Sequence, residues 1–130
     1  MMVVDASAIV ELLLNRAAAD RVRERLIAGG EMLHAPHLLD LEVTQALRRY
    51  CLRGVVSSER ATQALAYFRS LPLVRHPHAL FLSRIWELRH NVTAYDAAYL
   101  TLAESLGAPL LTCDQALAAS SGHTARVELV

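Results

Sequence analysis

Short apolar segments alternate with longer helical stretches along almost the whole chain of 130 residues. Strands that are separated by helices are typical of βαβ units, in which a parallel sheet carries helices on both faces. The alternation therefore predicts an α/β fold. Because no linker, repeat or low-complexity segment interrupts it, we expect a single domain over residues 1–130. The expected strands are residues 2–4, 32–34, 73–75, 109–112 and 126–129.

The stretches between these strands carry apolar residues at helical spacing. The clearest example spans residues 37–53 and is followed by Gly54, a common stop signal. Its apolar stripe consists of Leu39, Val43, Ala46, Leu47 and Tyr50. Another helix is expected at residues 58–70, with Ser57 or Ser58 as its N-cap. The remaining helices are expected in two stretches between Asp5 and Gly29–Gly30, from Pro77 to about residue 90, from Thr93 to Gly107, and briefly after Asp114.

Composition excludes several kinds of chemistry. Apolar residues make up 54% of the chain and charged residues 20%, which is typical of a globular protein. Arginine supplies all 13 positive charges, so there is no lysine for a Walker-type phosphate loop or a Schiff base. Thirteen acidic residues bring the formal net charge to zero. A net charge of zero does not exclude a local basic patch. Arg48 and Arg49 either form surface salt bridges or contact RNA phosphates.

No segment has the length and hydropathy of a membrane span or a secretory signal. The longest stretch without Asp, Glu, Lys or Arg covers residues 115–125 and is mostly small or polar. Cys51 and Cys113 lie far apart without a CxxC motif, which fits free thiols in a reducing compartment better than a disulfide. We therefore expect a cytoplasmic protein.

Four acidic residues occupy positions that a parallel sheet would bring together. Asp5 follows the first expected strand and Asp114 the fourth, while Glu42 lies in the helix after the second strand. Asp96 lies in the first turn of the helix that leads into the fourth strand. Functional groups gather at the carboxyl ends of parallel strands, so these four side chains are expected to converge if the first and fourth strands are neighbours.

Each of these acids also has a structural interpretation. Asp5 and Asp114 are suited to cap the helices that follow them, and Asp96 lies three residues after Thr93, as in a capping box. Glu42 could lie on the solvated flank of its helix. However, clustered carboxylates repel one another unless a cation neutralises them. Oxygen ligands of this kind favour Mg²⁺ or Mn²⁺.

Three segments of the chain carry a resemblance to a known family. VVDASAIVELL, LDLEVTQALRR and TAYDAAYLTLAESLGAPLLTCD resemble a PIN domain, specifically a toxin of the VapC type. The resemblance implies a three-layer α/β/α fold with a short, mainly parallel five-stranded sheet. It also implies that four acids bind metal, one from each of the first two segments and two from the third, with Ser7 and Thr112 as supporting hydroxyls. Those acids are Asp5, Glu42, Asp96 and Asp114.

Two positions depart from the pattern of that family. Asp40 lies two residues before Glu42, so Asp40 is an alternative metal ligand in this segment, although the register of the segment with the family motif favours Glu42. Ala116 stands where some relatives carry a further acid, which limits the expected site to four carboxylates.

The resemblance implies a Mg²⁺-dependent ribonuclease, with Mn²⁺ able to substitute. It also implies a cognate VapB-type antitoxin as partner, an RNA substrate and a homodimer, with no membrane association. The alternative is a non-catalytic PIN-like module that binds RNA or protein and whose acids cap helices. A phosphatase is a weaker interpretation, because the first strand ends in Asp-Ala-Ser rather than in paired aspartates.

Histidine and tryptophan give weaker signals. The i, i+4 spacing of a zinc hydrolase is absent from His34, His37, His76 and His78. We therefore expect these histidines either on the surface or in contact with the metal-binding residues, but not with the metal itself. Trp86 lies among apolar residues at helical spacing, which places it in the core or on a partner surface.

Overall fold

The computed structural model describes all 130 residues and contains one five-stranded sheet in the order β3-β2-β1-β4-β5. Every neighbouring pair of strands is parallel, and β1 pairs with β4 through Val3↔Leu110 and Val4↔Leu111. The expected parallel sheet is confirmed, as is the adjacency of the first and fourth strands. The strands are β1 (Met2–Val4), β2 (Leu33–Pro36), β3 (Leu73–His76), β4 (Leu110–Thr112) and β5 (Val127–Leu129).

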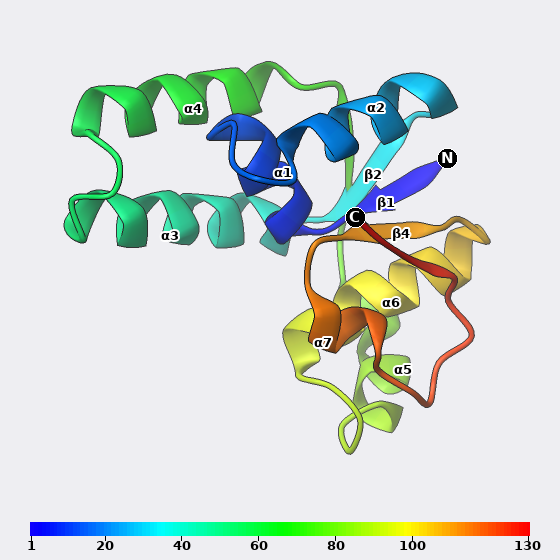
Figure 1. The fold of residues 1–130 in the computed structure, drawn as a ribbon. Helices are drawn as coiled ribbons and strands as arrows, with labels where there is room; N and C mark the ends of the chain where they lie inside the picture. Colours follow the sequence, from blue (N-terminus) through cyan, green and yellow to red (C-terminus); the bar gives the residue numbers. More distant parts are fainter.

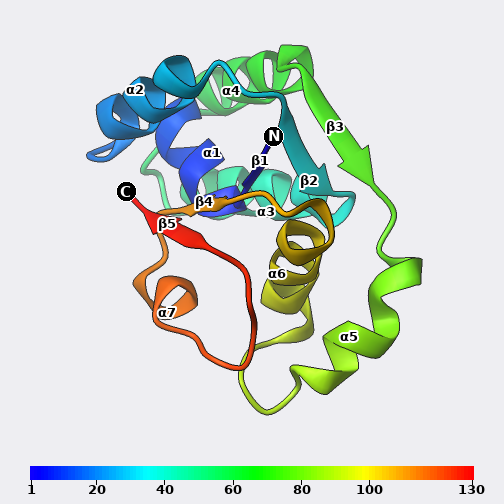
Figure 2. The same ribbon diagram turned by 90° about the vertical axis from the view of Figure 1, so that its right-hand side faces the viewer.

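Helices cover both faces of this sheet and complete three layers (Figures 1 and 2). One layer contains α1 (Ala6–Leu13), α2 (Ala19–Gly29), α3 (Leu38–Leu52) and α4 (Ser58–Ser70). The other contains α5 (Leu82–Glu87), α6 (Ala94–Leu106) and α7 (Gln115–Ala118). Figure 1 shows α3 and α4 side by side as an arm that projects beyond the sheet, with α6 and α7 below it.

The central strands are buried on both faces, which explains why they are apolar throughout. Val3, Val4, Leu110 and Leu111 are fully inaccessible to solvent. Helix α6 is buried through consecutive residues from Ala97 to Ala103, because it packs directly against the sheet. A strand or helix that is surrounded by protein carries a continuous apolar run instead of a stripe.

Local chemistry accounts for most of the element boundaries. The hydroxyl of Ser57 accepts a hydrogen bond from the Arg60 backbone N–H, and Thr93 accepts one from Asp96. Both residues therefore cap their helices as expected. Gly107 ends α6 in the left-handed conformation, with φ 60°, that glycine adopts at low cost.

Two expected elements differ from the structure. Strand β2 continues to Pro36, where it pairs with His76, instead of ending at residue 34. The helix expected from Pro77 to about residue 90 is broken into a 3₁₀ turn, Ala79–Phe81, followed by the short α5. The backbone of Phe81, at φ −101° and ψ 1°, departs from α-helical geometry and marks the break.

The side chain of Trp86 is not in the core. It is 67% exposed, with the Arg89 guanidinium 4.7 Å from its ring centroid, while Ile85 and Leu88 fill the core from the same segment. A core position for Trp86 was therefore wrong, and a partner surface stays a prediction. Both cysteines are free, and no helix has the length and apolar character needed to cross a membrane.

Candidate active site

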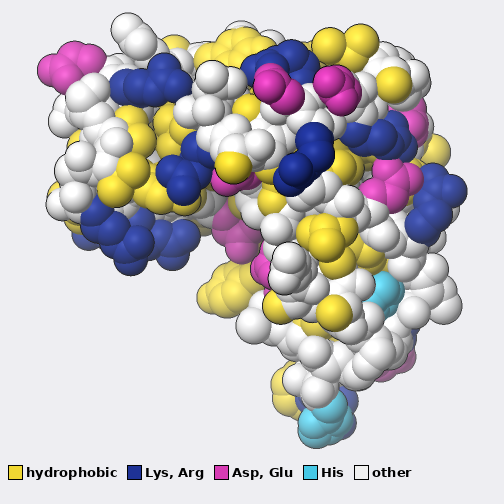
Figure 3. Space-filling view, in the orientation of Figure 1, with side chains coloured by type: hydrophobic (Ala, Val, Ile, Leu, Met, Phe, Trp, Pro, Cys, Tyr) yellow, Lys and Arg dark blue, Asp and Glu magenta, His cyan; other side chains and the backbone are white.

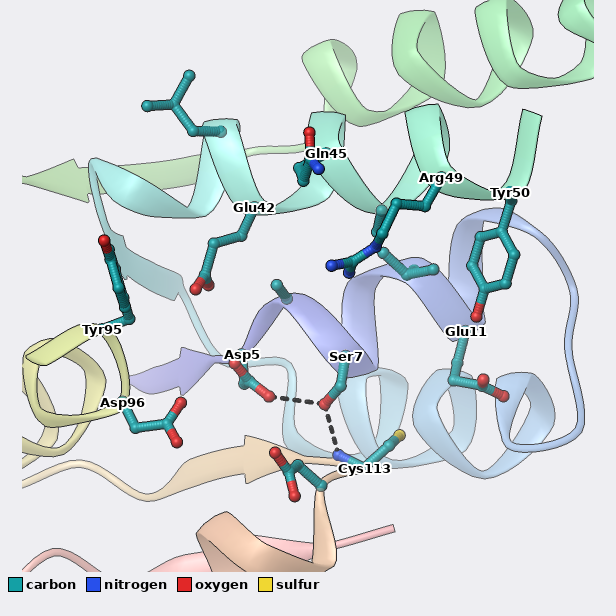
Figure 4. Close-up of a pocket in the computed structure, with 15 residues that line it drawn as sticks. Asp5, Ser7, Glu11, Glu42, Gln45, Arg49, Tyr50, Tyr95, Asp96 and Cys113 are labelled. Carbon is teal, nitrogen blue, oxygen red and sulfur yellow. Dashed lines mark hydrogen bonds between the residues drawn. The ribbon is translucent and has the colours of Figure 1, made fainter. Parts of the chain in front are cut away.

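The sheet and its helices bring the four predicted carboxylates to one cleft of about 620 Å³. Asp5 directly follows β1, and Asp114 follows the neighbouring β4. Glu42 reaches the cleft from α3 and Asp96 from the first turn of α6, as Figure 4 shows for Asp5, Glu42 and Asp96. In Figure 3, acidic side chains appear in the notch between the α3 arm and the part of the molecule that holds α6 and α7.

Two hydroxyls hold the carboxylate of Asp5, which is 6% exposed. Ser7 Oγ and Thr112 Oγ1 donate hydrogen bonds to the same oxygen, Oδ2, over 2.6 and 2.8 Å. Each hydroxyl accepts a backbone N–H in turn, from Cys113 and Asp114 respectively. The supporting positions predicted for Ser7 and Thr112 thus lie against Asp5. The second oxygen, Oδ1, accepts no hydrogen bond from the protein.

Asp114 is both a helix cap and a cleft residue. Its Oδ1 accepts hydrogen bonds from the backbone N–H groups of Ala116 and Leu117 at the start of α7, over 2.8 and 3.3 Å. The capping interpretation is therefore correct for Asp114, and its Oδ2 stays free. Asp5 forms no such bond at the start of α1, and Thr93 rather than the carboxylate of Asp96 caps α6.

Glu42 is fixed by a residue that we did not predict. The phenol of Tyr99, which is fully buried in α6, donates a 2.6 Å hydrogen bond to Glu42 Oε2. Tyr99 lies three residues after Asp96, so both side chains lie on one face of α6. The three-residue spacing between Asp96 and Tyr99 was the sequence signal from which Tyr99 could have been predicted. Burial raises the pKa of Glu42 above its usual range, and Asp5 and Asp96 add to the rise against the opposing Tyr99 bond.

The cleft concentrates negative charge, and Arg49 is the one cation that lines it. None of the four predicted carboxylates takes part in a salt bridge, whereas Glu11, the fifth acid that lines the cleft, pairs with Arg16, and most other acidic residues of the chain are paired as well. Burial raises the pKa of Asp96 to about 6, and repulsion by Asp5 and Asp114 contributes to the rise. A group in this setting favours any ligand that brings positive charge.

Asp40 does not lie in the cleft. Its two carboxylate oxygens accept hydrogen bonds from Arg75 Nε over 2.8 and 2.9 Å, on the opposite side of α3 from the cleft residues. The structure thus supports Glu42, rather than Asp40, as the residue of this segment that corresponds to the family motif. Arg48 and Arg49 form no salt bridge, so the salt-bridge interpretation is wrong for both, and only Arg49 lines the cleft.

The donor set fits a hard divalent cation. Asp5, Glu42 and Asp114 each have one oxygen held by the protein and one that accepts no protein hydrogen bond, and Asp96 has two. Carboxylate oxygens of this kind are the ligands that Mg²⁺ and Mn²⁺ prefer. No group of three or more acidic, histidine or cysteine side chains is already arranged to hold a metal ion.

Other potential reactive groups are poorly placed or inactive. No histidine lines the cleft, and His34 is buried in β2 with its Nδ1 2.8 Å from His76 Nε2. Cys113 lines the cleft, but burial, assisted by Glu11 and Asp5, raises the pKa of its thiol to about 11. Ser7 Oγ is committed to Asp5 and to the Cys113 backbone. The cleft thus offers carboxylates but no activated protein nucleophile.

A family model described as PIN domain matches residues 2–121. The chain belongs to the PIN-domain family and, by its relatives, to the VapC group within it. It is 45% identical over 130 residues to Ribonuclease VapC12 of Mycobacterium tuberculosis, covering 100% of this chain and 99% of that protein. It is also 35% identical over 121 residues to Ribonuclease VapC3 of Pyrobaculum aerophilum, covering 90% and 92%.

Two solved structures share the fold. PAE2754 from Pyrobaculum aerophilum superposes with a TM-score of 0.71 at 28% identity, covering 97% of this chain and 81% of that chain. VapC20 of Mycobacterium tuberculosis, a Sarcin-Ricin loop cleaving toxin, gives a TM-score of 0.71 at 20% identity, covering 95% and 97%. The first shares both fold and sequence with this chain, and the second supports the fold alone.

Proposed function

We propose that residues 1–130 act as a single PIN domain that hydrolyses RNA with a divalent metal ion, as the toxin of a toxin–antitoxin pair. The observation that carries this proposal is the convergence of Asp5, Glu42, Asp96 and Asp114 in one cleft, where none of them forms a salt bridge. Membership of the VapC group, whose relatives are ribonucleases, supports the same activity.

Mg²⁺, with Mn²⁺ as a substitute, would be held by the free oxygens of these four carboxylates. Such an ion supplies a water of lowered pKa and stabilises charge on the phosphate. The hydroxyls of Ser7 and Thr112 fix the position of Asp5, and the phenol of Tyr99 fixes that of Glu42. Fixed carboxylates lower the cost of reorganisation during the reaction.

Water is the nucleophile in this proposal, since the cleft offers no activated side chain. Its oxygen forms a bond to phosphorus, the bond to the 3′ oxygen breaks, and a proton is transferred to that leaving oxygen. The products are therefore a 5′-phosphate and a 3′-hydroxyl.

A VapB-type antitoxin and a second copy of the chain are the proposed protein partners, and the cytoplasm is the proposed location. Leu80, Leu82 and Trp86, which are 87%, 58% and 67% exposed, supply apolar surface near α5 for such contacts. The family relationship suggests both kinds of partner.

Thermal unfolding with and without Mg²⁺ or Mn²⁺ tests the metal site independently of RNA. A ligand that binds only the folded state raises its melting temperature. We expect wild type and Glu24→Gln, which removes an exposed acid that forms no salt bridge, to be stabilised alike. Asp5→Asn should lose most of the rise. No rise in wild type, or an equal rise in all three proteins, would support the alternative of a module without a catalytic metal.

A further inference from the structure

The character of the cleft wall changes along α3. Glu42, Gln45 and Arg49 line the cleft in succession, so the helix presents a carboxylate, an amide and then a guanidinium. Glu42 and Arg49 are nearly two turns apart and lie on one helix face, separated by about 10 Å along the axis. Figure 4 shows the guanidinium of Arg49 turned into the cleft.

The same face continues beyond the cleft. Arg53 is close to three turns from Glu42, so it extends the line that Arg49 begins, and it is exposed at the C-cap of α3. Arg48 points about 100° away from Arg49 around the helix and does not line the cleft. In Figure 3, arginine side chains gather over α3 beside the acidic notch.

The charge of Arg49 acts on Glu42 only at a distance, where it opposes the rise in the pKa of that carboxyl. Arg49 forms no salt bridge and donates no side-chain hydrogen bond, although Glu42 lines the same cleft. Paired arginines such as Arg75 and Arg84 contrast with it, because each is held by a carboxylate. An exposed guanidinium at the end of an acidic cleft is available to a ligand phosphate.

An exposed aromatic ring stands at the other end of the cleft. Tyr95 is 65% exposed, precedes Asp96 in α6 and lines the cleft, and Figure 4 shows it on the Glu42 side. Its ring packs against no other aromatic ring and no cation. Tyr50, at the Arg49 end, differs because the Arg16 guanidinium covers it at 4.7 Å from the centroid. Of the two tyrosine rings that line the cleft, only that of Tyr95 is free to stack on a base.

We propose that a single strand of RNA crosses the cleft in one orientation, with a base stacked on Tyr95 and a phosphate bound by Arg49. The phosphate to be cut lies between them, at the four carboxylates, and Arg53 reaches the backbone beyond Arg49. Stacking requires a base that is free of its duplex neighbours, so the preferred substrate is unpaired RNA. This inference rests on the proposed ribonuclease function, and it names positioning residues rather than catalytic ones.

The two contacts predict different signatures in a binding experiment. Arg49→Gln removes one phosphate contact, so the slope of log affinity against log salt should become shallower by about 0.7. Tyr95→Ala removes a stacking contact, so affinity should fall by about fivefold to a hundredfold with little change in slope. Tyr95→Phe retains the ring and should bind like the parent.

Fluorescence anisotropy with a labelled single-stranded RNA of mixed sequence, in Mg²⁺ and at several KCl concentrations, measures both signatures. All variants are made in Asp5→Asn, whose amide oxygen still accepts from Ser7 and Thr112, so that the RNA is not cut. Arg48→Gln controls for loss of an arginine in the same helix. Tyr67→Ala controls for loss of an exposed tyrosine, since Tyr67 is 52% exposed on α4.

The proposed path is supported if Arg49→Gln and Tyr95→Ala weaken binding well beyond their controls, each with its own salt signature. It is overturned if each variant matches its control, or if the parent does not bind the RNA. Digestion of total bacterial RNA by wild type in Mg²⁺ is scored separately. Absence of cleavage there would contradict the ribonuclease proposal, while the difference between variants and controls would still decide whether the RNA path exists.

Discussion

Tyr99 donates a 2.6 Å hydrogen bond to Glu42, and this bond joins the buried face of α6 to the cleft face of α3. The two residues are far apart in sequence and lie in different layers of the fold. Their contact determines where the carboxylate of Glu42 lies relative to Asp5 and Asp96.

Tyr99→Phe should therefore disturb the site without disturbing the core. The ring is fully buried and phenylalanine fills the same space, so the loss is confined to a hydrogen bond to a carboxylate, worth about 1.5 to 3 kcal/mol. We expect a lower free energy of unfolding in urea and a weaker Mg²⁺-induced stabilisation. Tyr67→Phe, on exposed α4, is the matched control, and equal behaviour of the two variants would contradict a role for the bond.

Asp96→Asn should stabilise the protein when metal is absent. The pKa of Asp96 is raised to about 6 in the folded state, so the native protein binds more protons than the unfolded chain between about pH 4 and pH 6. Wild-type stability therefore falls as pH rises through that window. The asparagine variant lacks this dependence, and its side chain gives up no protein hydrogen bond.

Because Asp96 is partly exposed, solvent screening reduces the effect to about 1 kcal/mol, or a rise of about 3 to 5 °C in Tm at pH 8. Melting curves in EDTA at pH 4 and pH 8 measure it, and the difference between variant and wild type should shrink at pH 4. The variant should also lose the Mg²⁺ response. A much lower Tm in EDTA with a full Mg²⁺ response would instead make Asp96 a structural residue.

Ser7→Ala and Thr112→Val should weaken metal binding, because both hydroxyls donate to the same oxygen of Asp5. Loss of a residue that orients a ligand commonly reduces metal affinity by about tenfold to a hundredfold. The Mn²⁺ affinity of each single variant and of the double variant can be measured by calorimetry. Because the hydroxyls share one acceptor and lie 3.2 Å apart, the two effects should not be additive. Strict additivity would mean that the hydroxyls act independently.

An antitoxin that places an arginine in the cleft should compete with Mg²⁺. A guanidinium and a divalent cation both neutralise the same carboxylates, and linkage requires each to weaken the other if their sites overlap. Titration of toxin with antitoxin at rising Mg²⁺ and constant ionic strength should show a falling apparent affinity. If the affinity of the antitoxin for the toxin stays constant, although Mg²⁺ binding has been shown separately, the shared site is ruled out. Inhibition would then have to come from steric blocking of the cleft alone.

Much of this site could be predicted because parallel strands impose a simple rule on sequence. Asp5 and Asp114 each follow a short apolar strand, and the carboxyl ends of neighbouring parallel strands meet at one edge. Glu42 and Asp96 lie near the starts of helices that face that edge. The caps at Ser57 and Thr93 were predictable for a local reason, since a hydroxyl at that position satisfies a free N–H.

Features that depend on packing between distant elements were not predictable. The Tyr99–Glu42 bond requires the approach of α6 to α3, and hydrophobic spacing alone could not show that Trp86 is exposed. The 3₁₀ turn before α5 depends on the backbone of Phe81. Arg49 and Arg48 are adjacent in sequence, and only the position of α3 against the cleft distinguishes them.

The most direct test of the central claim, that the four carboxylates form one metal-dependent RNA-cleaving site, is a comparison of wild type with Asp114→Asn. Asparagine keeps an oxygen that can cap α7, so this change removes charge from the cleft and leaves the helix start intact. The measurement maps new RNA 5′ ends after incubation with Mg²⁺ or with EDTA. We expect 5′-phosphate ends from wild type in Mg²⁺ alone, and none from Asp114→Asn, which should melt no lower than wild type in EDTA. Cleavage by Asp114→Asn at the wild-type rate, or cleavage by wild type in EDTA, would contradict it.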